Sequence, residues 1–422
     1  MGKEIFHKIS EKFFQLIDLF GKGQFILYSS VIDKILYFLL YVLLARALNL
    51  SDYGNFIGIM AFLNILFVIF DFGFGFYIQR EFSRSNDAEY RLNEIVYFRV
   101  YMFILYSGII FLYDYFFPSG NLLLLFLLSV PFYVNGFNNI LIKVIHGKGD
   151  YKVSFRPFVY SRIVFAAVLT VFLFYSDSVP LLASIFLTSS FIEFVLLSKI
   201  IGLRNILSLK RKVNLKNIYS IYKVSYPFAL GMISVVLYDK IDVLFIKEIL
   251  SPVEVSFYSV AYSFYKLPAL IPPVFLVPLY TEMSKFYQEK QKINFKAFRS
   301  TLLILSGFSL LVLGLYTISG GFFIDLFFGD RFISSSGLLK ILSIGFIFLV
   351  LNNLTGVTLN SINKEKYQLA GTISGVVVNI VLNVIMLPKI GIYGAVISTI
   401  SAEFTVLLIQ SVPLVSLYKN KL

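Results

Sequence analysis

The fold is decided by residues 225–283, which read SYPFALGMISVVLYDKIDVLFIKEILSPVEVSFYSVAYSFYKLPALIPPVFLVPLYTEM. Asp239, Lys240 and Asp242 lie in the middle of an apolar run that is long enough to cross a bilayer. A charged side chain at the centre of a membrane helix costs roughly 2.5 to 3.5 kcal/mol, so such groups pair, face a wet cavity and mark transport routes. The next run carries Lys266 and four prolines, which membrane helices tolerate where neighbours or cavity water satisfy the freed carbonyl groups. We interpret the two runs as the moving, substrate-facing half of a transporter.

The composition is that of a polytopic helical membrane protein. The 422 residues are 58% hydrophobic with a mean hydropathy of +0.81, and apolar runs of about twenty residues recur along the whole length. The net charge of +13 does not indicate nucleic acid, because the basic residues fall mostly on one side of the predicted spans. With no cysteine and only His7 and His146, the sequence predicts no thiol chemistry, metal site or cofactor.

Twelve apolar runs predict twelve membrane-spanning helices. They lie at 24–48, 55–79, 94–116, 121–143, 155–176, 179–201, 219–247, 255–284, 299–327, 337–361, 366–388 and 391–417. The domain organisation that we predict is an amphipathic interfacial segment over 1–23, a first lobe over 24–202, a basic cytoplasmic linker over 203–218, a second lobe over 219–418 and a cytoplasmic tail over 419–422.

The distribution of basic residues predicts the orientation. If the N-terminus is cytoplasmic, the inside links hold most of the lysines and arginines, whereas the outside links hold few and carry more acids. This positive-inside bias favours a multi-pass protein with both termini in the cytoplasm.

A weak internal repeat divides the chain into halves. LSDYGNF at 50–56 and LSPVEVSFY at 250–258 each follow a charged span, and six helices separate them. Because an even number of helices separates the two stretches, both halves of the chain have the same orientation across the membrane. We therefore predict two six-helix bundles related by a pseudo-two-fold axis along the membrane normal, with a substrate site between the lobes.

The first span carries a polar stripe that has two interpretations. Its members fall within about 100° of one helical face and are Ser30, Asp33, Lys34, Tyr37 and Tyr41. One interpretation is a cavity wall with Lys34 as an anion contact. The other is an Asp33 and Lys34 pair near the cytoplasmic surface.

The charges of the seventh span are deeper. Asp239 and Asp242 share a face, Lys240 projects about 100° away, and Asp239 lies close to the bilayer midplane. A functional role and a structural salt bridge to a neighbouring helix both remain open.

Lys266 lies about three turns into the eighth span beside Tyr258, Tyr262 and Tyr265. Cations and aromatic rings suit phosphate and sugar, whereas the alternative for the tyrosines is packing or an interfacial aromatic belt, which we favour for Tyr258. We rank lower the charges within reach of an interface, namely Asp71, Arg99, Arg162, Glu193, Lys223, Glu282 and Glu403.

No catalytic constellation competes with these sites. The sequence has no nucleophile elbow, phosphate loop, metal-ligand spacing or paired carboxylate in an outside loop, and the outside links are too short for an enzyme site. We expect that the protein is not an enzyme.

The chain resembles the Wzx-type polysaccharide flippases of the multidrug/oligosaccharidyl-lipid/polysaccharide (MOP) exporter superfamily. The residues that carry the resemblance are Leu50–Gly54, Asp71–Gly73, Pro227, Tyr238, Asp239, Asp242, Tyr258, Ala261, Pro278, Asn379, Asn383, Pro388 and Gly391–Ala395. One departure is Ser256, where the family commonly has glycine.

The resemblance implies an inner-membrane flippase that moves an undecaprenyl-diphosphate-linked oligosaccharide to the outer leaflet, for O-antigen, lipopolysaccharide or other polysaccharide biosynthesis. Lys34, Lys240 and Lys266 would then bind the diphosphate, and Tyr37, Tyr41, Tyr262 and Tyr265 the sugar. Asp239 and Asp242 would hold Lys240 or bind a coupling proton or sodium ion, and Asp33 and Asp71 would pair or couple in the same way. Implied partners are the substrate, membrane lipids and other polysaccharide assembly proteins, but no nucleic acid. The rivals are a multidrug exporter of the same fold, which would need a negatively charged cavity, and a membrane glycan polymerase.

Overall fold

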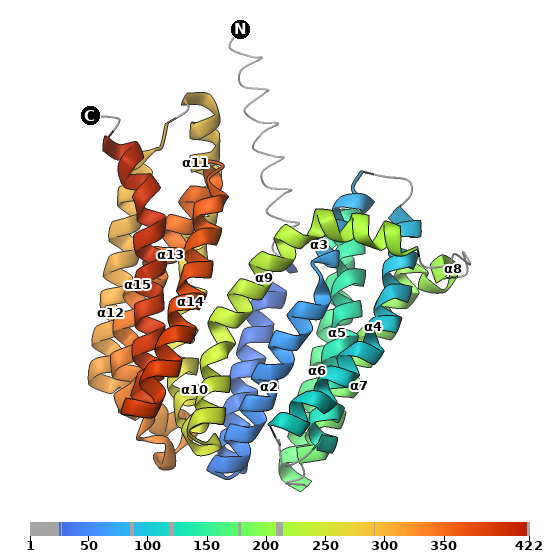
Figure 1. Cartoon of the computed structure of the whole chain (residues 1–422), viewed down its shortest axis with the longest axis horizontal. Coiled ribbons are helices and arrows are strands. Elements are labelled where there is room, and N and C mark those ends of the chain that lie inside the picture. Colours follow the sequence, from blue (N-terminus) through green and yellow to red (C-terminus); the bar gives the residue numbers. More distant parts are fainter. Residues whose placement is uncertain are drawn as a thin grey trace. The chain divides into compact units, whose positions relative to one another are not determined.

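The computed structural model describes residues 25–26, 28–84, 88–117, 122–175, 179–207, 214–290 and 292–419. Every regular element in these ranges is a helix (Figure 1). The predicted amphipathic segment over 1–23 lies outside the described residues.

The helices follow the predicted apolar runs closely. After a first helix at Tyr28–Ala47 come α2 (Leu50–Asp71), α3 (Phe74–Phe82), α4 (Ala88–Phe116), α5 (Leu122–Gly147), α6 (Tyr151–Tyr175), α7 (Val179–Ile201), α8 (Leu203–Leu207), α9 (Leu215–Ile249), α10 (Pro252–Lys266), η1 (Leu267–Leu270), α11 (Pro272–Lys290), α12 (Phe295–Phe328), η2 (Asp330–Phe332), α13 (Ser335–Ser361), α14 (Glu365–Ile390) and α15 (Tyr393–Lys419).

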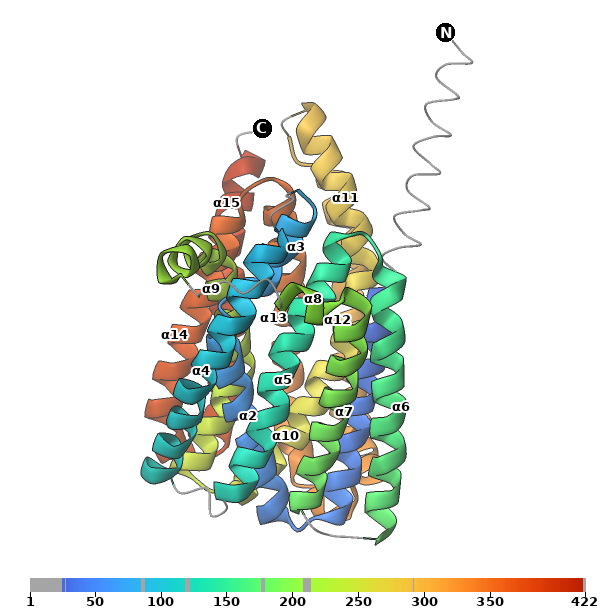
Figure 2. The same cartoon turned by 90° about the vertical axis from the view of Figure 1, so that its right-hand side faces the viewer.

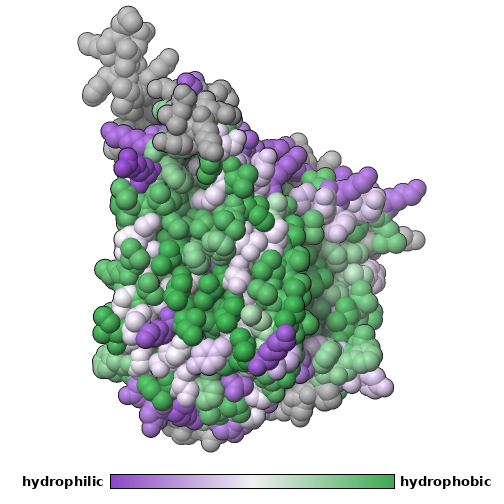
Figure 3. All heavy atoms as spheres, turned by 60° about the vertical axis from the view of Figure 1, so that its left-hand side comes forward, coloured by the Kyte–Doolittle hydropathy of each residue, from purple (hydrophilic) through white to green (hydrophobic). Residues whose placement is uncertain are grey.

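Ten of the described helices are long and apolar enough to cross a membrane, and the bent pair formed by α10 and α11 makes an eleventh span. The 35-residue α9, which is not among these eleven, lies over the seventh predicted span at 219–247. Many apolar side chains are exposed, among them Ile318 at 86% and Ile104 at 75%. Figure 3 shows apolar residues across the middle of one face and polar residues gathered toward its ends. The predicted fold class, an all-α polytopic membrane protein, is confirmed.

Contacts divide the chain into two units. Unit 1 comprises the residues up to Leu40 together with Leu66–Met232, and unit 2 comprises Tyr41–Ile65 together with Ile233–Leu422. The first helix, α2 and α9 therefore each contribute one part to each unit. The lobe boundaries that we predict from the sequence remain a prediction.

Unit 1 is built around a core that α3, α4, α5, α7, α8 and the start of α9 share. Within it α5 packs against α3 and α7, and α6 packs against α7 (Figure 2). The core includes fully buried aliphatic side chains such as Leu92, Ile95 and Leu197.

The second predicted span is not continuous, which corrects our prediction of one helix over 55–79. The chain breaks between α2 and α3 at Phe72 and Gly73, which have positive φ angles of 54° and 67°. A Cβ atom at Gly73 would lie 2.8 Å from the backbone oxygen of Ser225. The break therefore forms where the start of α9 approaches the backbone, and a residue without a side chain is needed there.

Unit 2 contains a group of neighbouring helices in which α13 packs against α12 and α15, and α14 packs against α15 (Figure 1). The bent span is also in this unit. α10 begins at a cap in which the Ser251 side chain accepts a hydrogen bond from the Glu254 amide. It ends at Lys266, where the prolines of η1 and α11 interrupt the helical hydrogen bonding, and the two halves are bent by 42°.

Candidate functional site

Asp239 on α9 is the centre of an ionic group in unit 2. Its carboxylate lies 2.9 Å from Lys240 Nζ and 3.0 Å from Lys266 Nζ, and it accepts a hydrogen bond of 2.8 Å from the Tyr262 hydroxyl. Lys240 projects about 100° away along the helix, but its long side chain folds back to the neighbouring carboxylate. The structure thus brings together the charges that the sequence identified in two separate spans.

This central group, defined as Asp239, Lys240, Lys266 and Tyr262, contains two ammonium groups and one carboxylate. The three charged side chains are 30% to 32% exposed, so they are neither sealed in the protein core nor fully solvated. Tyr41 lies close enough to interact electrostatically with Lys240 and Asp239. Two cations that share one anion have capacity for a second anion, and the rings of Tyr262 and Tyr265 lie 5.3 and 5.7 Å from Lys266 Nζ.

Asp242 has a different environment although it lies only three residues further on. It is 2% exposed and accepts hydrogen bonds from neutral groups on three other helices. The donors are Tyr258 Oη at 2.8 Å, Thr399 Oγ1 at 2.7 Å, Asn379 Nδ2 at 2.8 Å and Asn383 Nδ2 at 2.5 Å. Among the described residues the Oδ1 atom of Asn383 has no hydrogen-bond partner. Asp242 is therefore a buried carboxylate surrounded by oxygen atoms and amides, and it does not hold Lys240.

The three tyrosines of α10 each donate to a different carboxylate. Tyr258 donates to Asp242, Tyr262 to Asp239, and Tyr265 to Glu403 on α15 at 3.2 Å. Tyr258 is buried in unit 2 and bonded to Asp242 and Thr399, which agrees with the packing alternative that we favoured for it and not with an interfacial aromatic belt. Tyr265 is directed to Glu403, although its ring lies 5.7 Å from Lys266 Nζ.

Glu403 is a site residue that the sequence analysis named but ranked below the central charges. It is 3% exposed, and its carboxylate also accepts a hydrogen bond of 2.6 Å from Asn352 on α13. Thr399, which donates to Asp242, was missed by the sequence analysis. The available signal in the sequence was a polar residue within an apolar run, as at Glu403, Asn352 and Thr399. Their partners can be identified only from the tertiary packing.

The polar stripe of the first span is divided between the units. Asp33 pairs with Arg162 on α6 at 2.6 Å and not with Lys34, and Arg162 also lies 3.4 Å from Glu193 on α7. Tyr37 lines a small pocket beside Asp33 and Arg162. Lys34 is exposed in unit 1, whereas Lys240 and Lys266 belong to unit 2.

Asp71 and Arg99 form a buried ion pair in unit 1. Each side chain is 1% exposed, and the two charged groups are 3.2 Å apart. The guanidinium lies over the rings of Tyr133 and Phe137, and the Tyr133 hydroxyl donates to the Arg99 carbonyl. A Cβ atom at Gly136 would lie 1.9 Å from Arg99 Nη2, so α5 approaches the pair too closely for a side chain at that position.

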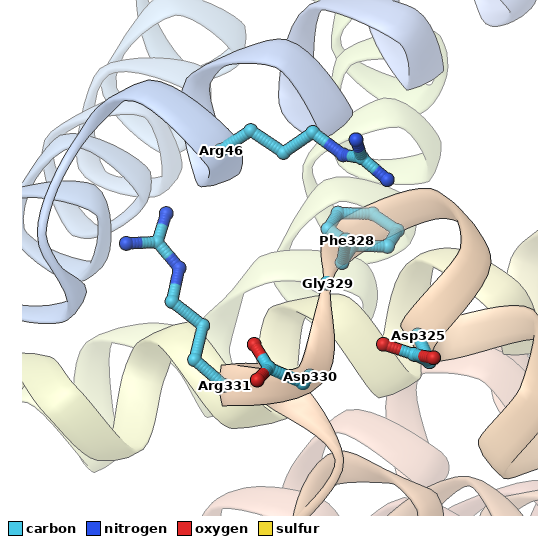
Figure 4. A pocket seen from close by; sticks show the side chains of 6 residues that line it. All are labelled: Arg46, Asp325, Phe328, Gly329, Asp330 and Arg331. Atoms are coloured by element: carbon cyan, nitrogen blue, oxygen red, sulfur yellow. The ribbon is translucent and has the colours of Figure 1, made fainter.

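A second region of unit 2 has mixed charge. Arg46 and Arg331 extend over a pocket of about 590 Å³ that Asp325 and Asp330 also line (Figure 4). Arg46 donates to two backbone carbonyls in the last turn of α12, at 2.6 and 2.7 Å, and so caps that helix. Two arginines and two aspartates balance, so this pocket lacks the excess positive charge of the central group.

No cluster of three or more His, Cys, Asp or Glu side chains within the described ranges could hold a metal ion. Charged and polar side chains are instead distributed as pairs and hydrogen-bonded carboxylates inside a set of apolar helices. These features define a polytopic helical membrane protein.

The chain belongs to the polysaccharide biosynthesis protein family, whose model matches residues 20–284. The MatE model matches residues 227–385. The resemblance that we inferred from the sequence motifs is therefore confirmed at the level of the superfamily.

The similar proteins include the uncharacterized membrane protein MJ1068 of Methanocaldococcus jannaschii, which is 28% identical over 115 residues. That match covers 27% of this chain and 22% of the relative. Among solved structures, the lipid II flippase MurJ in an inward closed conformation has a TM-score of 0.70 at 18% identity, over 92% of this chain and 86% of MurJ. An inward-facing multidrug resistance MATE family transporter has a TM-score of 0.69 at 17% identity, over 92% and 96% of the two chains. A MOP superfamily transporter from Pyrococcus furiosus has a TM-score of 0.61 at 14% identity, over 94% and 95%.

Proposed function

We propose that the protein is a flippase that moves an undecaprenyl-diphosphate-linked oligosaccharide repeat unit from the cytoplasmic to the outer leaflet of the inner membrane. Transport would proceed by alternating access and would supply O-antigen or another surface polysaccharide. Membership of the polysaccharide biosynthesis protein family supports this proposal, as does a fold similar to that of the lipid II flippase MurJ.

The observation that carries the proposal is the excess positive charge of the central group. Asp239 is the only carboxylate within the group and neutralises one of its two ammonium groups, while Glu403 acts on Lys266 electrostatically but is bonded to Asn352 and Tyr265. A diphosphate can replace the carboxylate on Lys240 and Lys266 without moving either lysine far, because both bonds are already to anionic oxygen. When the diphosphate leaves, Asp239 forms its ion pairs with Lys240 and Lys266 again, so neither ammonium group is left unpaired in a partly buried site.

The same charge disfavours a multidrug exporter for organic cations, which would need a site with net negative charge. The sugar would lie against the rings of Tyr41 and Tyr262. Lys34 would contact the diphosphate at another point on the transport path. Tyr37 and Tyr265 would serve the sugar less directly, since one lines the Asp33 pocket and the other is bonded to Glu403.

Asp242 is the stronger candidate for a coupling ion. Asp239 is bonded to lysines, whereas Asp242 is bonded only to neutral donors. A single buried carboxylate can take up a proton, or can bind sodium together with the oxygen atoms of Thr399 and Asn383. Either ion would neutralise its charge.

The test combines deletion with substitution. In a strain that lacks the gene, we expect a lipid-linked oligosaccharide to accumulate on the cytoplasmic side and surface glycan to disappear. Lys240→Gln or Lys266→Gln should fail to restore the glycan at normal protein abundance, whereas Lys340→Gln, which changes an exposed lysine of the same unit, should restore it. Near-complete surface glycan in both central variants would contradict the assignment of the diphosphate site.

A further inference from the structure

A pocket of about 570 Å³ lies in unit 1 where α3, the end of α5, the start of α6 and α9 meet. Its walls include Phe76 on α3 and Phe228 on α9, whose rings stack with centroids 5.4 Å apart and an interplanar angle of 17°. These large apolar side chains are 40% and 48% exposed. The pocket therefore presents an aromatic wall beside open space, and the transport site that we propose in unit 2 does not use it.

Basic side chains surround this wall. Lys143 Nζ lies 4.7 Å from the centroid of the Phe76 ring, and Lys143 takes part in none of the ion pairs found among the described residues. Arg80 lines the pocket with 39% of its side chain exposed, and it meets Glu81 only at 3.5 Å. Lys148 lies between two glycines that line the same pocket. Opposite charge near the pocket comes from Glu81 and the exposed Asp150, and two buried carboxylates also act electrostatically there, Asp71 on Lys143 and Glu94 on Tyr77.

The location of these residues indicates the kind of ligand. All three basic residues fall in or beside links that the charge distribution predicts to be cytoplasmic. Basic pockets between membrane helices on the cytoplasmic side bind the phosphates of acidic lipid head groups. The volume is within the range of small-ligand pockets, and half-exposed aromatic rings suit the boundary between head group and acyl chain.

We propose that this pocket binds the head group of an acidic phospholipid of the cytoplasmic leaflet. Arg80 and Lys143 contact the phosphate, and the stacked pair of Phe76 and Phe228 contacts the glycerol and the first methylene groups. A resident phospholipid is favoured over the lipid-linked oligosaccharide because Lys143 rests on a ring, and the carboxylate that acts on it, Asp71, is buried and already paired with Arg99, so it is not available to replace the ligand when it leaves. At the central group, Asp239 provides that exchange.

The test measures phospholipid binding to the purified full-length protein by native mass spectrometry and titration. The probes are phosphatidylglycerol and phosphatidylcholine with identical acyl chains. We expect the wild-type protein to prefer phosphatidylglycerol. Because one basic residue near a membrane surface contributes about a fivefold preference for anionic lipid, Arg80→Gln combined with Lys143→Gln should lower the affinity for phosphatidylglycerol roughly 25-fold.

The matched control is Lys364→Gln, which changes a lysine of unit 2 that also lies over an aromatic ring, that of Tyr367 at 5.7 Å. Its affinity for phosphatidylglycerol should equal that of the wild type. Both substituted residues of the pocket are partly exposed, so an unchanged thermal unfolding temperature would show that the double variant is folded. Equal affinity for the two lipids, or equal affinity of the double variant and the control, would overturn the proposal. Displacement of the bound phosphatidylglycerol by lipid-linked oligosaccharide would overturn it as well, because the pocket would then belong to the substrate.

Discussion

Replacement of Asp239 by asparagine removes the carboxylate that bonds both Lys240 and Lys266 while leaving the shape of the side chain nearly unchanged. The central group then has two ammonium groups and no anion. If a diphosphate binds by displacing Asp239, the substitution removes the competitor. We therefore expect tighter binding of diphosphate and slower transport, because the lysines no longer have an alternative partner when the substrate leaves.

The magnitude follows from the bonds that are exchanged. A hydrogen bond to a charged group contributes about 1.5 to 3 kcal/mol, and the lower value applies here because the three side chains are about 30% exposed to solvent. A gain of about 1.4 kcal/mol corresponds to a tenfold tighter dissociation constant. Since the competing interaction is ionic, this gain should shrink as salt is raised.

The assay is calorimetric titration of purified protein with inorganic pyrophosphate, followed by transport of labelled lipid-linked oligosaccharide in proteoliposomes. Asp325→Asn is the matched control, since it changes an exposed aspartate of the same unit outside the central group. Pyrophosphate affinity that is unchanged or weaker in Asp239→Asn, in protein of wild-type stability, would refute the reasoning.

Two further predictions concern buried charges. Gly136→Ala places a methyl group 1.9 Å from Arg99 Nη2, so the buried ion pair must separate; we expect a loss of about 3 kcal/mol or more of unfolding free energy and a lower unfolding temperature. Gly108→Ala, which meets no atom within 4 Å, should leave that temperature unchanged, and equal effects of the two substitutions would count against this account. Asp242→Asn should abolish the dependence of transport on a proton or sodium gradient and leave pyrophosphate affinity intact. Gradient-dependent transport by that variant would show that the coupling ion binds elsewhere.

The lengths of the apolar runs predicted the helices well, because each spanning segment must by itself be long enough to cross the hydrocarbon core of the bilayer. The break at Phe72 and Gly73 was not predictable in this way, since its cause is the approach of Ser225, more than 150 residues away in the sequence. A hydropathy pattern contains no information about such a contact.

The central group was predictable in part. Charges within apolar runs identified Asp239 and Lys266, because their cost in lipid demands an explanation wherever they lie. Their separate roles were not predictable, since Asp239 and Asp242 share a helical face and differ only in what packs against them. The neutral partners of Asp242 come from α10, α14 and α15, and a hydroxyl or an amide in a membrane helix is too common to be assigned from sequence.

The position of Lys266 has a mechanical consequence. It is the last residue of α10, and the next residue begins the turn at which the span bends by 42°. The 19 residues of α11 beyond this turn form a lever roughly 28 Å long, so a change of about 10° in the bend would move its far end by roughly 5 Å. A ligand that pulls on the Lys266 ammonium group acts beside this bend, where a small displacement is amplified at the distant end of the helix.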